Sequence, residues 1–186
     1  MMVNIFDGRL VSRGRRLMLA ALLLLSGCAT SPPPGIRPVE HFDFARYSGT
    51  WYEIARLDHR FEAGLTQIKA SYSLSEDGSV RVVNQGREVD TGLWREAVGR
   101  ALFTGRKDQG SFKVSFFGPF YGGYHIAALD DQGYSWALVV GPSLDYFWIL
   151  ARTPKIPDDL LSALLQKARL LGVDPARLIL TPQDPP

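Results

Sequence analysis

Cysteine and histidine, which serve enzymes as thiol nucleophiles, general bases and zinc ligands, are scarce in this chain of 186 residues. It holds a single cysteine, Cys28, and three histidines, His41, His59 and His125. No two histidines have the His-x-x-x-His spacing that brings two imidazoles onto one helical face to bind a metal. The Gly-x-Ser-x-Gly turn of hydrolases and the glycine loop that cradles phosphates are also missing. We therefore expect no catalysis and no metal or cofactor, although a triad assembled from distant residues would leave no such motif.

The first 27 residues separate basic from apolar side chains. Four arginines, the last of them Arg16, stand against one acidic residue, and an uninterrupted apolar run follows from Leu17 to Leu25. This run is too short to span a bilayer as a helix, which takes about 20 residues, but it has the length of a signal-peptide core. We predict that residues 1–27 are a signal peptide. The remaining chain has 17 basic and 18 acidic residues, so it lacks the basic excess typical of nucleic-acid binding.

The apolar run closes in Leu25-Ser26-Gly27-Cys28, which resembles the bacterial lipobox, where the cysteine thiol receives a diacylglyceryl group. As the only cysteine, Cys28 cannot form a disulfide within the chain. We predict that Cys28 is lipidated, with palmitate among its acyl groups. Several acyl chains, each contributing about 0.8 kcal/mol per buried CH₂, hold a protein firmly on a membrane.

The residues after the cysteine bear on location. By the same resemblance, Ala29 in place of an aspartate implies the outer membrane, with the folded part in the periplasm. Residues 31–35 read Ser-Pro-Pro-Pro-Gly, and prolines favour an extended chain of about 3.1 Å per residue. We expect residues 28–41 to form a tether between the lipidated cysteine and the folded domain.

Short segments of strand character, separated by turn residues, fill the chain from residue 47 to residue 152. In 66–75, for example, apolar side chains occupy alternate positions, as in a strand with one buried face. Because the connections are short, the strands should pair with antiparallel neighbours, and closing the sheet would remove its edges. The pattern also permits a two-sheet sandwich. The eight expected strands are 49–57, 66–75, 80–89, 93–104, 111–117, 120–129, 134–141 and 146–152.

The character of the sequence changes after the last of these strands. Pro157 and two aspartates form a typical helix start, leucines then recur at helical spacing, and Gly172 can end the helix. The leucine stripe suits packing on the outside of the sheet, and it would also suit a partner protein. We expect a short final strand over residues 178–180. The expected fold is all-β: an eight-stranded antiparallel up-and-down β-barrel with one C-terminal α-helix outside it.

Three separated elements carry a family resemblance. Gly49 and Trp51 at the start of the first strand resemble the Gly-x-Trp signature of lipocalins, and Asp145-Tyr146 and Arg152 match the signature elements around the eighth strand. The resemblance implies that the arginine packs across the tryptophan at a closed barrel end, a cation–π contact of about 0.5–2 kcal/mol. Four longer stretches resemble bacterial outer-membrane lipocalins, namely 51–56, 58–62, 116–124 and 148–154.

This resemblance covers roughly residues 42–181 and defines an expected lipocalin domain over 42–186. It implies binding of fatty acids or lysophospholipids, a role in the storage or transport of lipids for envelope maintenance, and assembly as a homodimer. None of these properties follows from composition or spacing.

Strand parity offers a separate argument for the binding residues. If Arg152 points inward, then Leu150, Trp148 and Tyr146 share its face, and Trp148 stands in mid-cavity. The family's counterpart on the sixth strand is Tyr121. We hypothesise that Trp148 and Tyr121 flank an acyl chain.

Three further residues are weaker candidates. Tyr72 and Phe116 are weaker candidates to contact the acyl chain, and they would equally suit a filled core. Arg60 lies between the first two strands and could meet a phosphate or carboxylate if its segment crosses the barrel mouth. A solvated loop arginine is the alternative.

Two other functions fit the same sequence. The cavity could hold a pigment such as haem or a bilin, or the barrel could be packed solid and serve as an interaction module of the envelope. Lipid that co-purifies with the protein would separate the lipid binder from the solid barrel.

Overall fold

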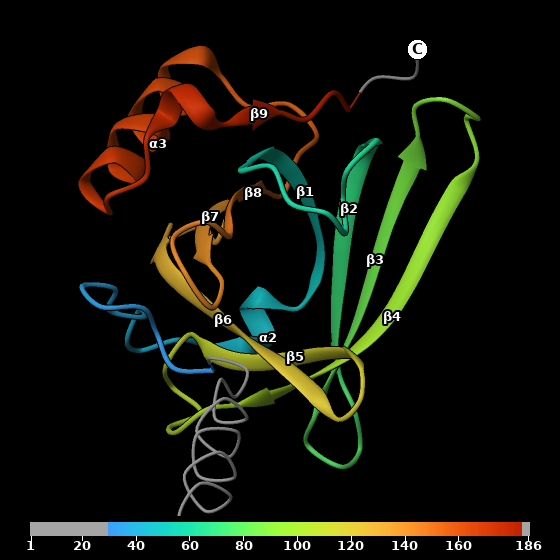
Figure 1. Ribbon diagram of the computed structural model, residues 1–186. Helices are drawn as coiled ribbons and strands as arrows, with labels where there is room; N and C mark the ends of the chain where they lie inside the picture. Colours follow the sequence, from blue (N-terminus) through green and yellow to red (C-terminus); the bar gives the residue numbers. More distant parts are fainter. Residues whose placement is uncertain (1–29, 184–186) are drawn as a thin grey trace, which may run out of the picture.

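The computed structural model describes residues 30–183; the predicted signal peptide and Cys28 lie outside this range. The strands β1 to β8 form one antiparallel sheet, in which β1 pairs with β8 on one side and with β2 on the other (Figure 1). These two pairings close the sheet, so the predicted eight-stranded barrel is confirmed. The strands are β1 Gly49–Arg56, β2 Leu65–Leu74, β3 Val80–Glu88, β4 Trp94–Phe103, β5 Ser111–Phe117, β6 Phe120–Leu129, β7 Trp136–Val140 and β8 Phe147–Ala151.

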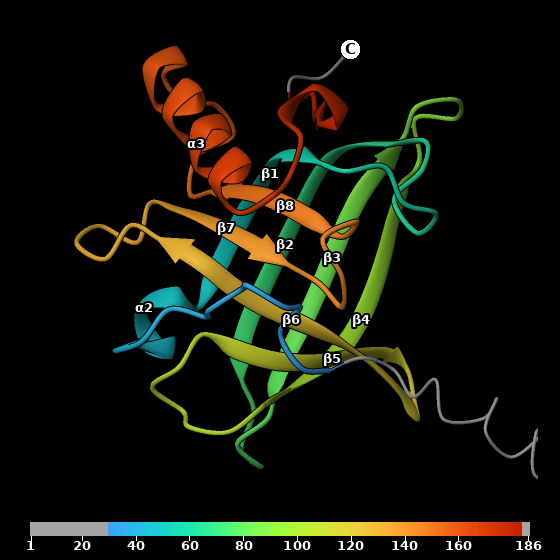
Figure 2. The same ribbon diagram turned by 60° about the vertical axis from the view of Figure 1, so that its left-hand side comes forward.

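The C-terminal part lies outside the barrel, as the leucine pattern predicted. Helix α3, Asp158–Leu170, buries Leu164 and Ala168 against the outer side of β1, β7 and β8 (Figure 2). Its aspartates lie at the positive end of the helix dipole. The helix is followed by the 3₁₀ turn η2, Pro175–Arg177, and by β9, Ile179–Leu180, which pairs with β1. No helix in the range 30–183 is long and apolar enough to cross a membrane.

Two apolar clusters result from this arrangement. One fills the barrel interior at the end where β1 begins, and the other lies between the barrel wall and α3. The short helix α2, Phe44–Tyr47, was not predicted; four residues are too few to show helical periodicity. It is capped by Asp43, whose Oδ1 accepts a hydrogen bond of 2.9 Å from the Ala45 N–H.

Arg152 covers the closed end. Its guanidinium carbon lies 4.0 Å from the centroid of the buried Trp51 ring, in the cation–π arrangement that the family resemblance implied. The same guanidinium donates hydrogen bonds of 3.2, 2.9 and 2.6 Å to the carbonyls of Tyr134, Thr50 and Arg46. One side chain therefore ties three chain segments together across the bottom of the barrel.

Arg152→Ala should lower the free energy of unfolding by about 2 kcal/mol, because it removes the ring contact and leaves three carbonyls without their donor. Arg152→Lys keeps the charge but cannot make the forked contacts, and it should recover less than half of the loss. Urea unfolding of the three proteins measures this. Equal stability of wild type and Arg152→Ala would show that the contacts of Arg152 do not stabilise the fold.

The expected tether needs a correction. Residues 33–41 do not stand away from the barrel: Pro33 and Ile36 are buried, and the Val39 N–H donates to the Ile126 carbonyl at 2.8 Å. Glu40 forms a β-bridge with Gln109. The side chains of Ile36 and Val39 pack against the barrel, but the prolines concealed this docking in the sequence. The folded unit thus begins before residue 42.

The closed barrel has one short strand pairing, between β4 and β5. Pairing between β4 and β5 is limited to Arg100–Phe103 opposite Phe112–Ser115, so the first half of β4 bonds only to β3. The β3–β4 hairpin therefore projects beyond the rest of the barrel (Figure 1). The projection lies at the end opposite Trp51, which we call the open end.

Candidate functional site

A cavity of about 300 Å³ lies inside the barrel. In an up-and-down barrel, the connections β1–β2, β3–β4, β5–β6 and β7–β8 all lie at one end. Residues of the first and last of these connections line the cavity, so the cavity reaches the open end. The side chains that line it are Glu53, Phe61, Glu62, Ile68, Ala70, Tyr72, Val82, Asn84, Val114, Phe116, Tyr124, Pro142, Tyr146, Trp148 and Leu150, together with Gly122 and Gly123.

The inner end of the cavity is formed by tyrosines. The Tyr124 hydroxyl lies 2.7 Å from that of Tyr47 and 2.9 Å from that of Tyr72, so the three form a hydrogen-bonded chain. Burial raises the pKa of each of these tyrosines above its usual value, which keeps them neutral. The hydroxyls bond to one another, and the rings present mainly apolar surface to the cavity.

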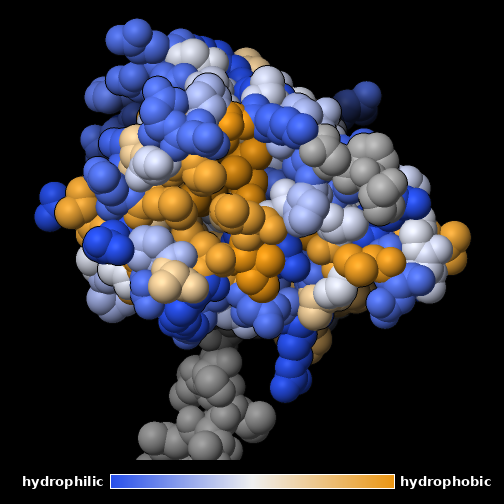
Figure 3. Space-filling view, turned by 90° about the horizontal axis from the view of Figure 1, so that it is seen from above, coloured by the Kyte–Doolittle hydropathy of each residue, from blue (hydrophilic) through white to orange (hydrophobic). Residues whose placement is uncertain are grey.

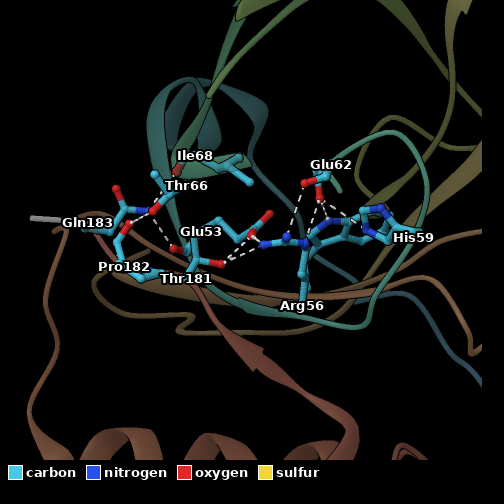
Figure 4. A network of polar contacts seen from close by, with 10 residues as sticks. Glu53, Arg56, His59, Glu62, Thr66, Ile68, Thr181, Pro182 and Gln183 are labelled. Atoms are coloured by element: carbon cyan, nitrogen blue, oxygen red, sulfur yellow. Dashed lines mark hydrogen bonds and ion pairs between the residues drawn. The ribbon is translucent and has the colours of Figure 1, made fainter. Parts of the chain in front are cut away.

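A buried polar cluster stands in the wall nearer the open end (Figure 4). Arg56 donates hydrogen bonds of 2.9 Å to the Glu53 carboxylate and 3.2 Å to the Glu62 carbonyl. Thr181, next to β9, donates to the same Glu53 oxygen. The Trp148 indole N–H donates to Glu62 Oε2 at 3.1 Å. The connection between β1 and β2 is therefore bonded to β1 and β8 through Glu62.

A bulge in β1 makes the cluster possible. The register of β1 against β8 shifts between Glu53 and Ala55, so that Ala55 packs in the cluster under α3 while Arg56 remains close to Glu53. The last described residues support the same wall. Gln183 donates to the carbonyls of Glu53 and Ile68 at 2.7 and 2.9 Å, which joins β1 to β2 (Figure 4).

Glu62 has no full counter-charge. Arg56 is bonded to Glu53, and its Nε lies 3.8 Å from Glu62 Oε2. Burial raises the pKa of the Glu62 carboxyl well above its usual 4.5, and the neighbouring Glu53 charge raises it further. The His59 imidazole lies 3.2 Å from Glu62. Burial, followed by the Arg56 charge, lowers the pKa of His59 to about 4. At neutral pH the polar cluster beside the cavity thus holds a neutral imidazole.

These two pKa shifts act on stability in opposite directions. Between pH 4.5 and 6.5 the unfolded chain binds a proton at His59 that the folded chain lacks, while the folded chain keeps a Glu62 proton that the unfolded chain has lost. The His59 effect ends near pH 6.5, whereas the Glu62 effect lasts while the folded protein keeps the Glu62 proton. The free energy of unfolding should then fall with rising pH by at most about 1.4 kcal/mol per pH unit, for as long as folded Glu62 keeps its proton.

Glu62→Gln should remove this fall and leave the opposite dependence below pH 6.5, a loss of stability on acidification caused by His59. Urea unfolding at a series of pH values from 4 to 8 measures both slopes. Parallel pH curves for wild type and Glu62→Gln would contradict the raised pKa of Glu62.

The structure brings several of the candidate binding residues together and separates others. Trp148, Tyr72 and Phe116 line the cavity. Tyr121 does not: Lys113 Nζ lies 5.1 Å from the centroid of its ring, and the two glycines that follow it face the cavity instead. Arg60 is exposed and is not a lining residue, although its neighbours on both sides belong to the buried cluster or the lining.

The signature residues of the family resemblance do not all lie at the same end of the barrel. Gly49, with φ of +94°, and Trp51 lie at the closed end beside Arg152, whereas Tyr146 lines the cavity near the open end. Asp145 is exposed and pairs with Arg177 at 3.4 Å. The signature residues are therefore spread over both ends of the barrel.

Sequence reasoning missed the polar wall. Glu53 could have been found, because it lies two residues after Trp51 on the same strand and so shares its inward face. No such signal exists for Glu62, Asn84 and Tyr124. Each lies on a connection or strand that is far in the sequence from Trp51, and only the fold brings it to the cavity. Asn84 Oδ1 is buried and lacks a hydrogen-bond partner among the described residues.

The fold and the cavity define a class of protein: a closed β-barrel, open at one end, that encloses a mainly apolar space of ligand size. The model of the family described as "Lipocalin-like domain" matches residues 42–183. The chain belongs to the lipocalin family, as its sequence motifs indicated.

Named relatives agree with this placement. The outer membrane lipoprotein Blc of Escherichia coli is 49% identical over 160 residues, which cover 86% of this chain and 90% of Blc. Apolipoprotein D of Mus musculus is 32% identical over 161 residues, covering 82% of each chain. Among solved structures, insecticyanin from the tobacco hornworm Manduca sexta has a TM-score of 0.65 at 20% identity, over 82% of this chain and 86% of that one.

Proposed function

We propose that this protein is a lipid-anchored lipoprotein of the bacterial outer membrane that binds one fatty acid or lysophospholipid in its barrel and catalyses no reaction. The observation that carries the proposal is the cavity of about 300 Å³, which is lined mainly by aliphatic and aromatic side chains and reaches the open end. Burying an acyl chain there contributes about 0.8 kcal/mol per CH₂, which is ample for binding.

The relatives support the location. Blc is named an outer membrane lipoprotein, and it is similar to this chain over nine tenths of its own length. Acylation of Cys28 and a barrel in the periplasm are parts of the same proposal, drawn from the resemblance to the lipobox. A homodimer and a role in envelope lipid maintenance are also parts of it, drawn from the family resemblance.

The polar wall supports a defined orientation of the ligand. The tyrosine hydroxyls at the inner end are bonded to one another, whereas Glu62 and the unpartnered Asn84 Oδ1 lie on the side wall. The acyl tail therefore enters first, and the polar head group stays near the connection that carries Arg60. The described lining contains no histidine, cysteine or methionine that could bind a haem iron, which leaves only tyrosine hydroxyls for that role.

Trp148→Ala should weaken lysophospholipid binding by about 10- to 30-fold, because it removes about 1.5–2 kcal/mol of apolar contact with the tail. The matched control is Trp136→Ala on β7, whose ring faces Lys167 of α3 outside the barrel, at 5.7 Å. A titration that follows displacement of a fluorescent fatty acid measures both. If Trp148→Ala binds as tightly as wild type, Trp148 is not part of the site. If wild type binds no lipid at all, the proposed function fails.

A further inference from the structure

Large apolar side chains are exposed around the open end. Six of the eleven large hydrophobic residues that are exposed in the described chain belong to three connections at this end or to the strand ends beside them. We call these six the mouth rim: Phe61, Val89, Leu93, Trp94, Phe117 and Phe120. The two phenylalanines that flank the β5–β6 turn are the most exposed of the six, at 81% and 70%.

The topology gathers the rim at one end. Phe61 lies in the β1–β2 connection, Leu93 and Trp94 lie at the end of the β3–β4 hairpin, and Phe117 and Phe120 flank the β5–β6 turn. Seen from above, hydrophobic surface runs across the middle of this face, and more appears at its right edge, the side where the β3–β4 hairpin lies in Figure 1 (Figure 3). Exposed apolar groups so concentrated mark an interaction surface.

The start of the described chain places a membrane close to this surface. Ser31 contacts His125 on β6 through its backbone, and Pro33 is buried on the barrel. Figure 2 shows this start beside β5 and β6. Only Ala29 separates Cys28 from Thr30 in the sequence, and two residues of extended chain reach at most about 7 Å. A bilayer that holds an acylated Cys28 must therefore lie against the barrel.

The β5–β6 turn is within reach of such a bilayer. Phe120 lies five residues from His125 along the same strand, a distance of roughly 17 Å at the usual rise. The flanks of the rim carry cations over aromatic rings: Lys113 over Tyr121 at 5.1 Å, and Lys69 over Trp94 at 5.5 Å. Tyrosine, tryptophan and lysine are the residues that accumulate at the membrane–water interface.

We infer that the mouth rim inserts into the lipid surface to which the proposed anchor holds the protein, with the β5–β6 turn as its leading contact. This inference rests on the proposed function. In this arrangement Tyr121, which lies outside the cavity, would be at the lipid surface. The entrance of the cavity would face the lipid from which a ligand would come.

The test uses the full acylated protein in phosphatidylethanolamine–phosphatidylglycerol vesicles. Acylation consumes the Cys28 thiol, so Phe120→Cys adds one thiol that can be labelled with an environment-sensitive dye. Leu74→Cys is the matched control, because Leu74 is 62% exposed at the opposite end of the barrel. The dye at position 120 should shift to shorter emission wavelength, be quenched by lipids with brominated tails and resist iodide. The dye at position 74 should stay open to iodide.

Equal iodide access at the two positions would overturn the inference. Shielding at position 120 that disappears when protein is diluted at constant lipid concentration would also overturn it, since a second copy of the chain would then be the partner. The anchor is checked separately by the mass of the mature protein. If no acyl group is found, the anchor in the proposed function fails, and the dye test on Cys28→Ser/Phe120→Cys protein mixed with vesicles still decides whether the rim inserts.

Discussion

Ala70→Trp is expected to lower lysophospholipid affinity roughly a hundredfold while the barrel stays folded. Ala70 lines the cavity, and an indole on this β2 position occupies much of the space that the acyl tail would fill. Excluding about four methylenes from the cavity costs about 3 kcal/mol of binding free energy. The same fatty-acid displacement titration measures the effect, and circular dichroism checks the fold.

Ser73→Trp is the matched control for this substitution. Ser73 lies on the same strand, is exposed and faces away from the cavity, so the added ring should leave lipid affinity unchanged. If Ala70→Trp bound lipid as well as Ser73→Trp does, the ligand would have to bind elsewhere than in the barrel.

Arg56→Met is expected to lower the free energy of unfolding by about 3–5 kcal/mol, the largest loss of any single substitution considered. The arginine side chain is 5% exposed and Glu53, at 2.9 Å, is 2% exposed, so the substitution leaves a carboxylate buried without its cation. Urea unfolding measures the loss. The double substitution Glu53→Gln/Arg56→Met removes the unpaired charge as well and should recover part of it.

The control for Arg56 is an exposed ion pair. Arg177 and Asp145 are 61% and 73% exposed and lie 3.4 Å apart, so Arg177→Met should change stability by less than about 0.5 kcal/mol. If the two arginine substitutions had similar effects, burial would not be what makes the Glu53–Arg56 pair important.

The strands and the outer helix could be predicted because their signals are local. Turn residues separate the strands, apolar residues alternate clearly in strands such as β2, and every predicted strand end lies within two residues of the observed end. Parity along β8 also places Trp148 and Leu150 in the cavity, because β8 pairs with β7 in unbroken register.

The rest of the site depends on features that break such local rules. Register shifts occur in β1, between β5 and β6, and between β6 and β7, so counting residues from a known inward position fails there. The family resemblance points to Tyr121 on β6, whereas Tyr124, three residues later on the same strand, lines the cavity. Glu62 meets Arg56 and Trp148 only through the path of a connection, and spacing in the sequence does not record that path.

A crystal structure with a lysophospholipid whose tail ends in bromine tests the central claim most directly. We predict one anomalous bromine peak inside the barrel, between Trp148 and the hydroxyls of Tyr72 and Tyr124, with the head group toward the open end. A barrel interior without ligand density, together with bromine found only on the outer surface, would contradict the account.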